Sequence, residues 1–155
     1  MSITKEQALE RAQRLCVKSE HCEYDIRLKL RQWQVEPDTF DSIISSLISD
    51  KFIDPVRYAR SFTRDKSTNN KWGATKIRYA LIAKGINADI IDNAIAENLN
   101  DDELLSTLVK LLKSKLRTIH DDDMRSRHAK LFRFAVSRGY TLEQTNEALG
   151  QIENI

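Results

Sequence analysis

Apolar side chains recur at helical spacing along this chain. Near the N-terminus Leu9, Ala12 and Leu15 are three positions apart, which places them on one face of a helix. The next segment continues the pattern with Ile26 and Leu30, four positions apart. Similar stripes run to the C-terminus, separated by short polar stretches. The pattern predicts a chain built almost entirely of α-helices.

Three turns of related sequence interrupt the stripes, and they are Trp33-Gln34-Val35, Lys84-Gly85-Ile86 and Arg138-Gly139-Tyr140. Each lies where a helix should close, and glycine suits the left-handed conformation found at that place. The central residues are 51 and 54 positions apart, and apolar residues stand at matching offsets from each turn. Such a period is typical of stacked helical units. We therefore expect an all-α, elongated, curved array of three tandem three-helix repeats, helix-turn-helix-like units that cover residues 1–53, 54–100 and 101–155.

Capping signals mark the expected helix ends. A Thr4/Gln7 pair and a Thr141/Gln144 pair can each form a capping box. We expect Ser19 to cap the second helix. Pro37 and Pro55 stand at expected first helical positions, and Asn87, after the second turn, is a capping residue. Acidic clusters at residues 101–103 and 121–123 stand where two further helices should begin. Residues 66–72 are the best candidate for a loop.

Composition narrows the class of protein. Only 4 glycines and 2 prolines occur in 155 residues, which leaves little room for tight hairpins. No apolar run approaches the roughly 18 residues of a membrane span, and no signal segment is evident at the N-terminus. Two cysteines are too few for a disulfide framework. We expect a cytoplasmic monomer.

Charge is distributed unevenly along the chain. The net charge is +2 in total, but the three units carry −1, +3 and 0. Residues 57–84 contain eight basic side chains and one acid, and Arg57, Arg60 and Arg64 share one helix face. This face, with Trp72 beside it, suits an acidic partner such as a phosphate backbone or a carboxylate-rich protein. A solvated helix surface is the alternative interpretation.

The chain lacks the residue patterns of known catalytic and metal sites. Cys16, His21 and Cys22 do not have the spacing of a structural zinc site, and buried thiols explain them better. The acids after His120 are explained more simply by helix capping than by cation binding. No glycine-rich phosphate loop appears. We expect a binding protein without catalytic residues, metal or cofactor.

Several short motifs follow one another in a characteristic order. The first is Ser19-Glu20 with Asp25-Ile26 and Leu30, and the second is Phe52-Ile53-Asp54 with Arg57-Tyr58-Ala59. Gly73 with Ile77-Arg78 and Leu81 comes next, followed by the Gly85 and Gly139 turns. In this order and spacing, over about residues 8–149, the chain resembles the RecX family of RecA regulatory proteins. It departs from the family pattern at Lys51-Phe52, where Gly-Tyr is usual, at Pro55, which replaces an aspartate, and at Gln34, which replaces glycine. These departures fall at turns and caps.

The resemblance implies a modulator of RecA that has no catalytic residues. Such a protein binds RecA or the RecA–single-stranded-DNA filament, and it inhibits the recombinase, ATPase and coprotease activities, with weak direct contact to DNA. The basic residues of the middle unit then become the candidate RecA- and DNA-binding surface, and they are Arg57, Arg60, Arg64, Lys71, Trp72, Lys76 and Arg78. Two alternatives stay open, a DNA-binding helical protein that acts without RecA, and a helical scaffold for another protein.

Overall fold

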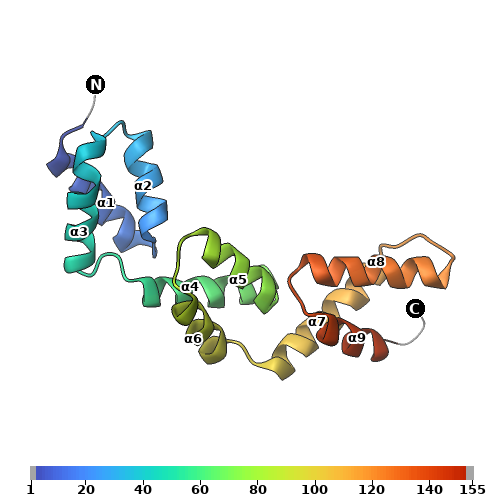
Figure 1. Ribbon diagram of the computed structural model, residues 1–155. Helices are drawn as coiled ribbons and strands as arrows, with labels where there is room; N and C mark the ends of the chain where they lie inside the picture. Colours follow the sequence, from blue (N-terminus) through green and yellow to red (C-terminus); the bar gives the residue numbers. More distant parts are fainter. Residues whose placement is uncertain (1–2, 153–155) are drawn as a thin grey trace.

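The computed structural model describes residues 3–152, and its α-helices follow one another along an elongated, bent array (Figure 1). The elements are α1 (Lys5–Lys18), α2 (Glu23–Gln32), the short 3-10 helix η1 (Pro37–Thr39), α3 (Phe40–Ser49), α4 (Pro55–Thr68), α5 (Ala74–Ala83), α6 (Ala88–Asn98), α7 (Asp101–Leu116), α8 (Met124–Ser137) and α9 (Leu142–Gly150). No strand occurs within these residues. The predicted all-α fold is confirmed.

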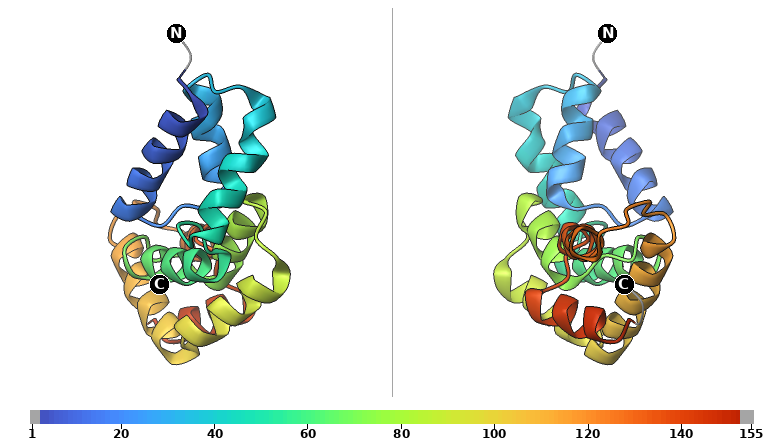
Figure 2. Two further views of the ribbon diagram at one scale, coloured as in Figure 1. Left: turned by 90° about the vertical axis from the view of Figure 1, so that its left-hand side faces the viewer. Right: turned by 90° about the vertical axis from the view of Figure 1, so that its right-hand side faces the viewer.

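Buried apolar side chains gather in three separate clusters, one for each group of three helices. Leu30 lies at the centre of the first, Leu81 of the second and Leu108 of the third, and all three are fully buried. Seen from either end of the array, α1–α3 rise to one side of the other two groups (Figure 2). The chain is therefore a curved series of small cores, as the repeat pattern predicts.

The three turns adopt the same conformation. Gln34, Gly85 and Gly139 all have positive φ, at 59°, 77° and 93°. The last residue of each turn donates its backbone N–H to a carbonyl five positions earlier, which satisfies one of the free carbonyls at the helix end. The pairs are Val35 to Leu30, Ile86 to Leu81 and Tyr140 to Ala135. Glutamine thus occupies a position that the other two groups give to glycine.

Two expected boundaries are wrong, although both capping boxes are confirmed. Ser19 does not cap the second helix. It is the C-cap of α1, where its N–H donates to the Leu15 carbonyl, and Cys22 is the N-cap of α2. The expected loop at residues 66–72 starts later, because α4 continues to Thr68 and ends at Asn69, whose side chain donates to Asp65. No proline or glycine stands in this segment to break the helix earlier.

Neighbouring groups meet at corresponding places. We call the contact between α1–α3 and α4–α6 the first joint, and that between α4–α6 and α7–α9 the second joint. In each, the turn that closes the second helix of one group lies against the N-terminus of the second helix of the group before. At the first joint Lys84 forms an ion pair with Asp25, with 2.5 Å between Nζ and Oδ1. At the second, the Gly139 turn meets Gly73, the N-cap of α5.

The two joints differ in chemistry. The second consists largely of backbone hydrogen bonds: Gly73 N–H donates to the Arg138 carbonyl at 2.7 Å, and Thr75 N–H donates to the Gly139 carbonyl at 3.0 Å. The first consists of side-chain ion pairs, supplemented by Cys22, which packs into the middle cluster. Packing therefore crosses the sequence boundary, and the unit limits 1–53, 54–100 and 101–155 stay a prediction. Their outer ends, residues 1–2 and 153–155, lie outside the described residues.

Candidate interaction surface

Arg57 belongs to the first joint. Its Nε lies 2.5 Å from Oε1 of Glu20, and its Nη2 donates to the Lys51 carbonyl at 2.9 Å. The side chain is 43% exposed. Arg57 thus connects α4 to the loop before α2, and much of its hydrogen-bonding capacity is used within the chain.

The next two arginines of α4 reach the C-terminal end of α6. Arg60 Nε lies 3.2 Å from Oε2 of Glu97, and Arg64 Nε donates to the Asn98 side-chain oxygen at 2.6 Å. The Arg60 pair is about half exposed on both sides, and such surface pairs contribute only about 0–1 kcal/mol. Both guanidinium groups therefore remain available to a competing anion.

Trp72 lies among aromatic and basic side chains, of which Lys76 is also a predicted site residue. Lys76 Nζ lies 4.5 Å from the centre of its ring, and Lys66 Nζ lies 5.2 Å from it. Phe62 meets the same ring edge-on at 6.3 Å. We call Phe62, Lys66, Trp72 and Lys76 the Trp72 cluster. All four are half-buried, and a tryptophan between two ammonium groups presents positive charge and a stacking surface together.

Lys71 lies at the second joint. Its backbone adopts the left-handed conformation with φ of 58°, and its carbonyl accepts a hydrogen bond from the Tyr140 hydroxyl at 2.8 Å. Burial raises the pKa of Tyr140 to about 12, so this hydroxyl stays protonated as a donor. The Lys71 side chain itself is exposed. Lys71 and the Trp72 cluster thus flank the contact with α7–α9.

The seven predicted residues lie at several places in the array. Arg57 lies at the first joint, Arg60 and Arg64 lie beside α6, and Arg78 forms an ion pair with Asp92 across α5 and α6. Trp72 and Lys76 lie together, with Lys76 Nζ over the indole ring. The three-and-four spacing located one face of α4 but gave no information on which acids would face it.

Sequence reasoning missed the basic and aromatic residues on the other side of the second joint. The Arg138 guanidinium lies 5.0 Å from the centre of the Phe134 ring, and Lys115 Nζ lies 5.3 Å from it. Arg138 also donates to the Asn70 carbonyl at 3.3 Å. Lys66 was likewise not chosen, although it stands in the basic stretch of residues 57–84. An aromatic residue four positions before a basic one, as in Phe62/Lys66 and Phe134/Arg138, was the sequence signal that could have found Lys66 and Arg138.

Lys84 and Asp25 dominate the electrostatics of the first joint. Burial alone would raise the pKa of Asp25, but the hydrogen bond and charge of Lys84 outweigh it and hold that pKa below its ordinary value. Reciprocally, burial opposes the charge on Lys84, yet Asp25 raises the Lys84 pKa above its usual range. The structure thus pairs Lys84 with an acid of the neighbouring group, across the first joint.

Replacing Lys84 by methionine is expected to raise the pKa of Asp25, because burial remains and the counter-charge is lost. A carboxylate with a lowered pKa stabilises the fold above its ordinary pKa and loses this contribution as pH falls through its folded value. The free energy of unfolding of the wild type should thus exceed that of Lys84→Met by about 1 kcal/mol at neutral pH, and the difference should vanish once the pH lies well below the ordinary carboxyl value of 3.8. Thermal unfolding at both pH values and an NMR titration of Asp25 measure this. An equal difference at both pH values would contradict the role given to the pair.

The structure places the residues considered for metal binding in other roles. Cys16 and Cys22 are buried free thiols, and burial raises the pKa of each. Asp123 caps α8. Hydrogen bonds from Ser126 and from the Asp123 backbone, together with Lys130, lower the pKa of Asp121 to about 2. Among residues 3–152 no His, Cys, Asp and Glu side chains gather closely enough to hold a metal ion. In the same part of the chain, no helix is long and apolar enough to cross a membrane.

Known proteins contain the same kind of three-helix groups. Residues 56–95 match the second three-helix domain of RecX, and residues 101–149 match its third three-helix domain. A regulatory protein RecX from Clostridium acetobutylicum is 30% identical over 148 residues, which is 94% of this chain and 68% of that protein. The chain belongs to the RecX family of regulatory proteins. The predicted family is confirmed.

Other RecX proteins agree in sequence and fold. The regulatory protein RecX of Prosthecochloris aestuarii is 26% identical over 86% of this chain and 85% of its own length. The crystal structure of RecX from Lactobacillus salivarius matches 97% of both chains with a TM-score of 0.79 at 20% identity. A second RecX crystal structure reaches a TM-score of 0.86 over 95% of this chain and 73% of its own, at 22% identity. RecX proteins thus share the elongated helical array.

Proposed function

We propose that this RecX-family chain binds RecA, as the filament on single-stranded DNA, and inhibits its ATPase, recombinase and coprotease activities. The observation that carries the proposal is the match of residues 56–95 and 101–149 to consecutive three-helix domains of RecX on one elongated array. It acts as a cytoplasmic, monomeric binding protein and not as an enzyme. Several small groups joined end to end can contact neighbouring protomers of a filament at once, and linked weak contacts combine through effective concentration.

The seven residues predicted from sequence remain the proposed RecA- and DNA-binding surface, with unequal parts. The half-buried Trp72 cluster and the exposed Lys71 supply positive charge and an aromatic face beside the second joint. Arg60 holds the exposed Glu97 and Arg64 holds the half-buried amide of Asn98, and both arginines can exchange these partners for those of a bound protein or phosphate. Arg57 mainly supports the first joint. Binding across both joints would resist rearrangement of the filament or block its growth.

The Trp72 cluster gives the proposed surface its sharpest test. The triple variant Lys66→Glu/Trp72→Ala/Lys76→Glu should bind RecA–single-stranded-DNA filaments at least tenfold more weakly, because it removes two cations and the ring between them. Lys110→Glu, a charge reversal at an exposed position of α7, is the matched control and should bind within about twofold of wild type.

Fluorescence anisotropy of the labelled protein, titrated with preformed filaments, measures the affinity. Circular dichroism checks that the helical content is unchanged. Wild-type affinity in a folded triple variant would show that the contact lies elsewhere.

The alternative is a DNA-binding protein that acts without RecA, and its support is the positive charge at the second joint. Binding driven by phosphate contacts weakens steeply with salt, because it depends on the release of counterions. We expect binding to RecA-free single-stranded DNA to be weak and strongly salt-dependent, and binding to filaments to persist at higher salt. Strong DNA binding at high salt, with no effect of RecA, would reverse the order of the two functions.

A further inference from the structure

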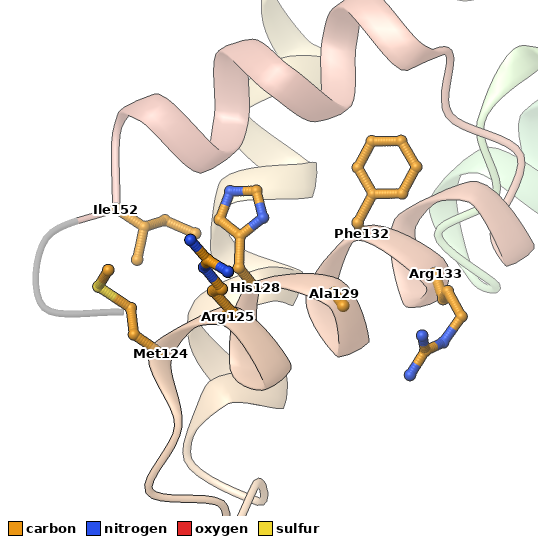
Figure 3. Close-up of a pocket in the computed structure, with 7 residues that line it drawn as sticks. All are labelled: Met124, Arg125, His128, Ala129, Phe132, Arg133 and Ile152. Carbon is orange, nitrogen blue, oxygen red and sulfur yellow. The ribbon is translucent and has the colours of Figure 1, made fainter.

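A groove between α8 and the end of α9 is lined mainly by apolar side chains. Figure 3 shows Met124, His128 and Phe132 on the side of α8 that faces α9, with Ile152 at the end of the groove. Its volume is about 730 Å³, within the range of about 300–1,000 Å³ usual for ligand pockets. Met124 is 62% exposed. Within residues 3–152 nothing covers this surface.

The other two groups carry an ion pair at the corresponding place. The fifth residue after the N-cap of the second helix is Arg27 in the first group and Arg78 in the second. Arg27 pairs at 2.7 Å with Asp41, and Arg78 pairs with Asp92, each acid being five residues after the cap that opens the third helical segment. These pairs join the two helices on that face.

The third group replaces both members of the ion pair. His128 occupies the position of the arginines, and Asn146 that of the aspartates. Four positions to either side of His128 stand Met124 and Phe132, where the first group has Glu23 and Arg31. The helix face that is charged and closed by an ion pair in the first group is therefore apolar and open in the third group.

The charges around the groove have one sign. Arg125 and Arg133 line it together with His128, and no carboxylate does. Neither arginine has an acidic partner among the described residues. An apolar floor along α8, with Ile152 after α9 at its end and a basic rim, suits a helix that carries apolar side chains on one face and carboxylates beside them.

We propose that the α8–α9 groove binds an acidic amphipathic helix of a protein partner. Its apolar side chains fill the space between Met124, Phe132 and Ile152, and its carboxylates face Arg125 and Arg133. The inference rests on the proposed function and deepens it, because it names the chemistry of the segment through which the regulated protein is bound.

Introducing into the third group the ion pair that the other two groups carry tests the proposal without changing a buried side chain. His128 and Asn146 are both exposed, so His128→Arg/Asn146→Asp should fold normally and close the groove. His120→Arg/Asn93→Asp makes the same changes at exposed positions that do not line the groove, and it is the matched control. The probe is a fluorescein-labelled 16-residue helix with leucine at every third or fourth position and glutamate elsewhere.

Wild type and the control should bind this peptide equally, and the groove variant should bind at least tenfold more weakly. A peptide with lysine in place of glutamate should not bind. Failure of the acidic peptide to bind wild type, equal binding to the groove variant, or equal binding of the lysine peptide would overturn the proposal. Two further outcomes would also overturn the proposal. Displacement of the bound peptide by a single-stranded oligonucleotide, in wild type but not in the groove variant, would assign the groove to nucleic acid. A dimer that forms in wild type but not in the groove variant, seen by sedimentation, would assign the groove to a second copy of the chain.

The same variants, titrated with RecA–single-stranded-DNA filaments, separate this inference from the proposed function. A tenfold loss of filament affinity in the groove variant alone supports both. If the groove variant binds filaments as tightly as wild type, the proposal for the groove is overturned and the proposed function stands. If wild type does not bind filaments, the proposed function fails, and the peptide titration still decides whether the groove takes an acidic helix.

Discussion

Gly139→Ala is expected to lower the free energy of unfolding by about 2–5 kcal/mol, one of the two largest effects expected in this protein. A Cβ at this position would lie 2.3 Å from Cβ of Lys76 and 2.6 Å from its backbone nitrogen, so the second joint would have to open. The φ of 93° adds a cost of about 1–2 kcal/mol for any residue with a Cβ, and overpacking adds about 1–3 kcal/mol.

Gly85→Ala is the matched control for this substitution. Gly85 occupies the equivalent turn with φ of 77°, but a Cβ there would meet nothing within 4 Å. We expect Gly85→Ala to cost only the about 1–2 kcal/mol of the backbone conformation. Chemical denaturation of both variants measures the difference. Equal losses would show that the close approach at the second joint contributes nothing to stability.

Leu30→Ala is expected to destabilise α1–α3 by about 2–5 kcal/mol, because Leu30 is fully buried at the centre of the first cluster. The first cluster shares no buried residue with the other two, and the first joint consists of side-chain ion pairs together with Cys22, which packs into the middle cluster. The loss should therefore fall mainly on the first group, which then unfolds before the rest of the array.

Amide hydrogen exchange locates this loss. Protection should fall across α1–α3 and persist in α7–α9, whereas Leu108→Ala, at a fully buried position of the third cluster, should give the mirror image. Uniform loss of protection along the chain in both variants would show one cooperative unit and contradict the separation of the cores.

The turns could be predicted from sequence because their physics is local. Glycine at positions 85 and 139 adopts a left-handed conformation that few other residues adopt easily, and the same offset identified Gln34. Ser19 could not be rejected as a cap on local grounds, since Ser is among the best N-cap residues. The choice of Cys22 depends on tertiary packing, because this thiol fills a space in the middle cluster.

The candidate surface was harder to predict, because the partners of its arginines are distant in sequence. Nothing near Arg57 indicates that Glu20 will face it, and nothing near Arg60 indicates Glu97. Reversing Arg57 to glutamate would place two carboxylates together at the first joint, so this substitution would test stability as well as binding. The α8–α9 groove shows the opposite case: it becomes visible only when His128 and Asn146 are aligned with their counterparts in the other two groups.

The central claim is that this chain regulates RecA, and single-stranded-DNA-dependent ATP hydrolysis by RecA tests it most directly. With the wild-type protein titrated in, the rate should fall with concentration and level off, and Lys66→Glu/Trp72→Ala/Lys76→Glu should need at least tenfold more protein for the same effect. An unchanged rate at every reachable concentration of correctly folded wild type would contradict the claim.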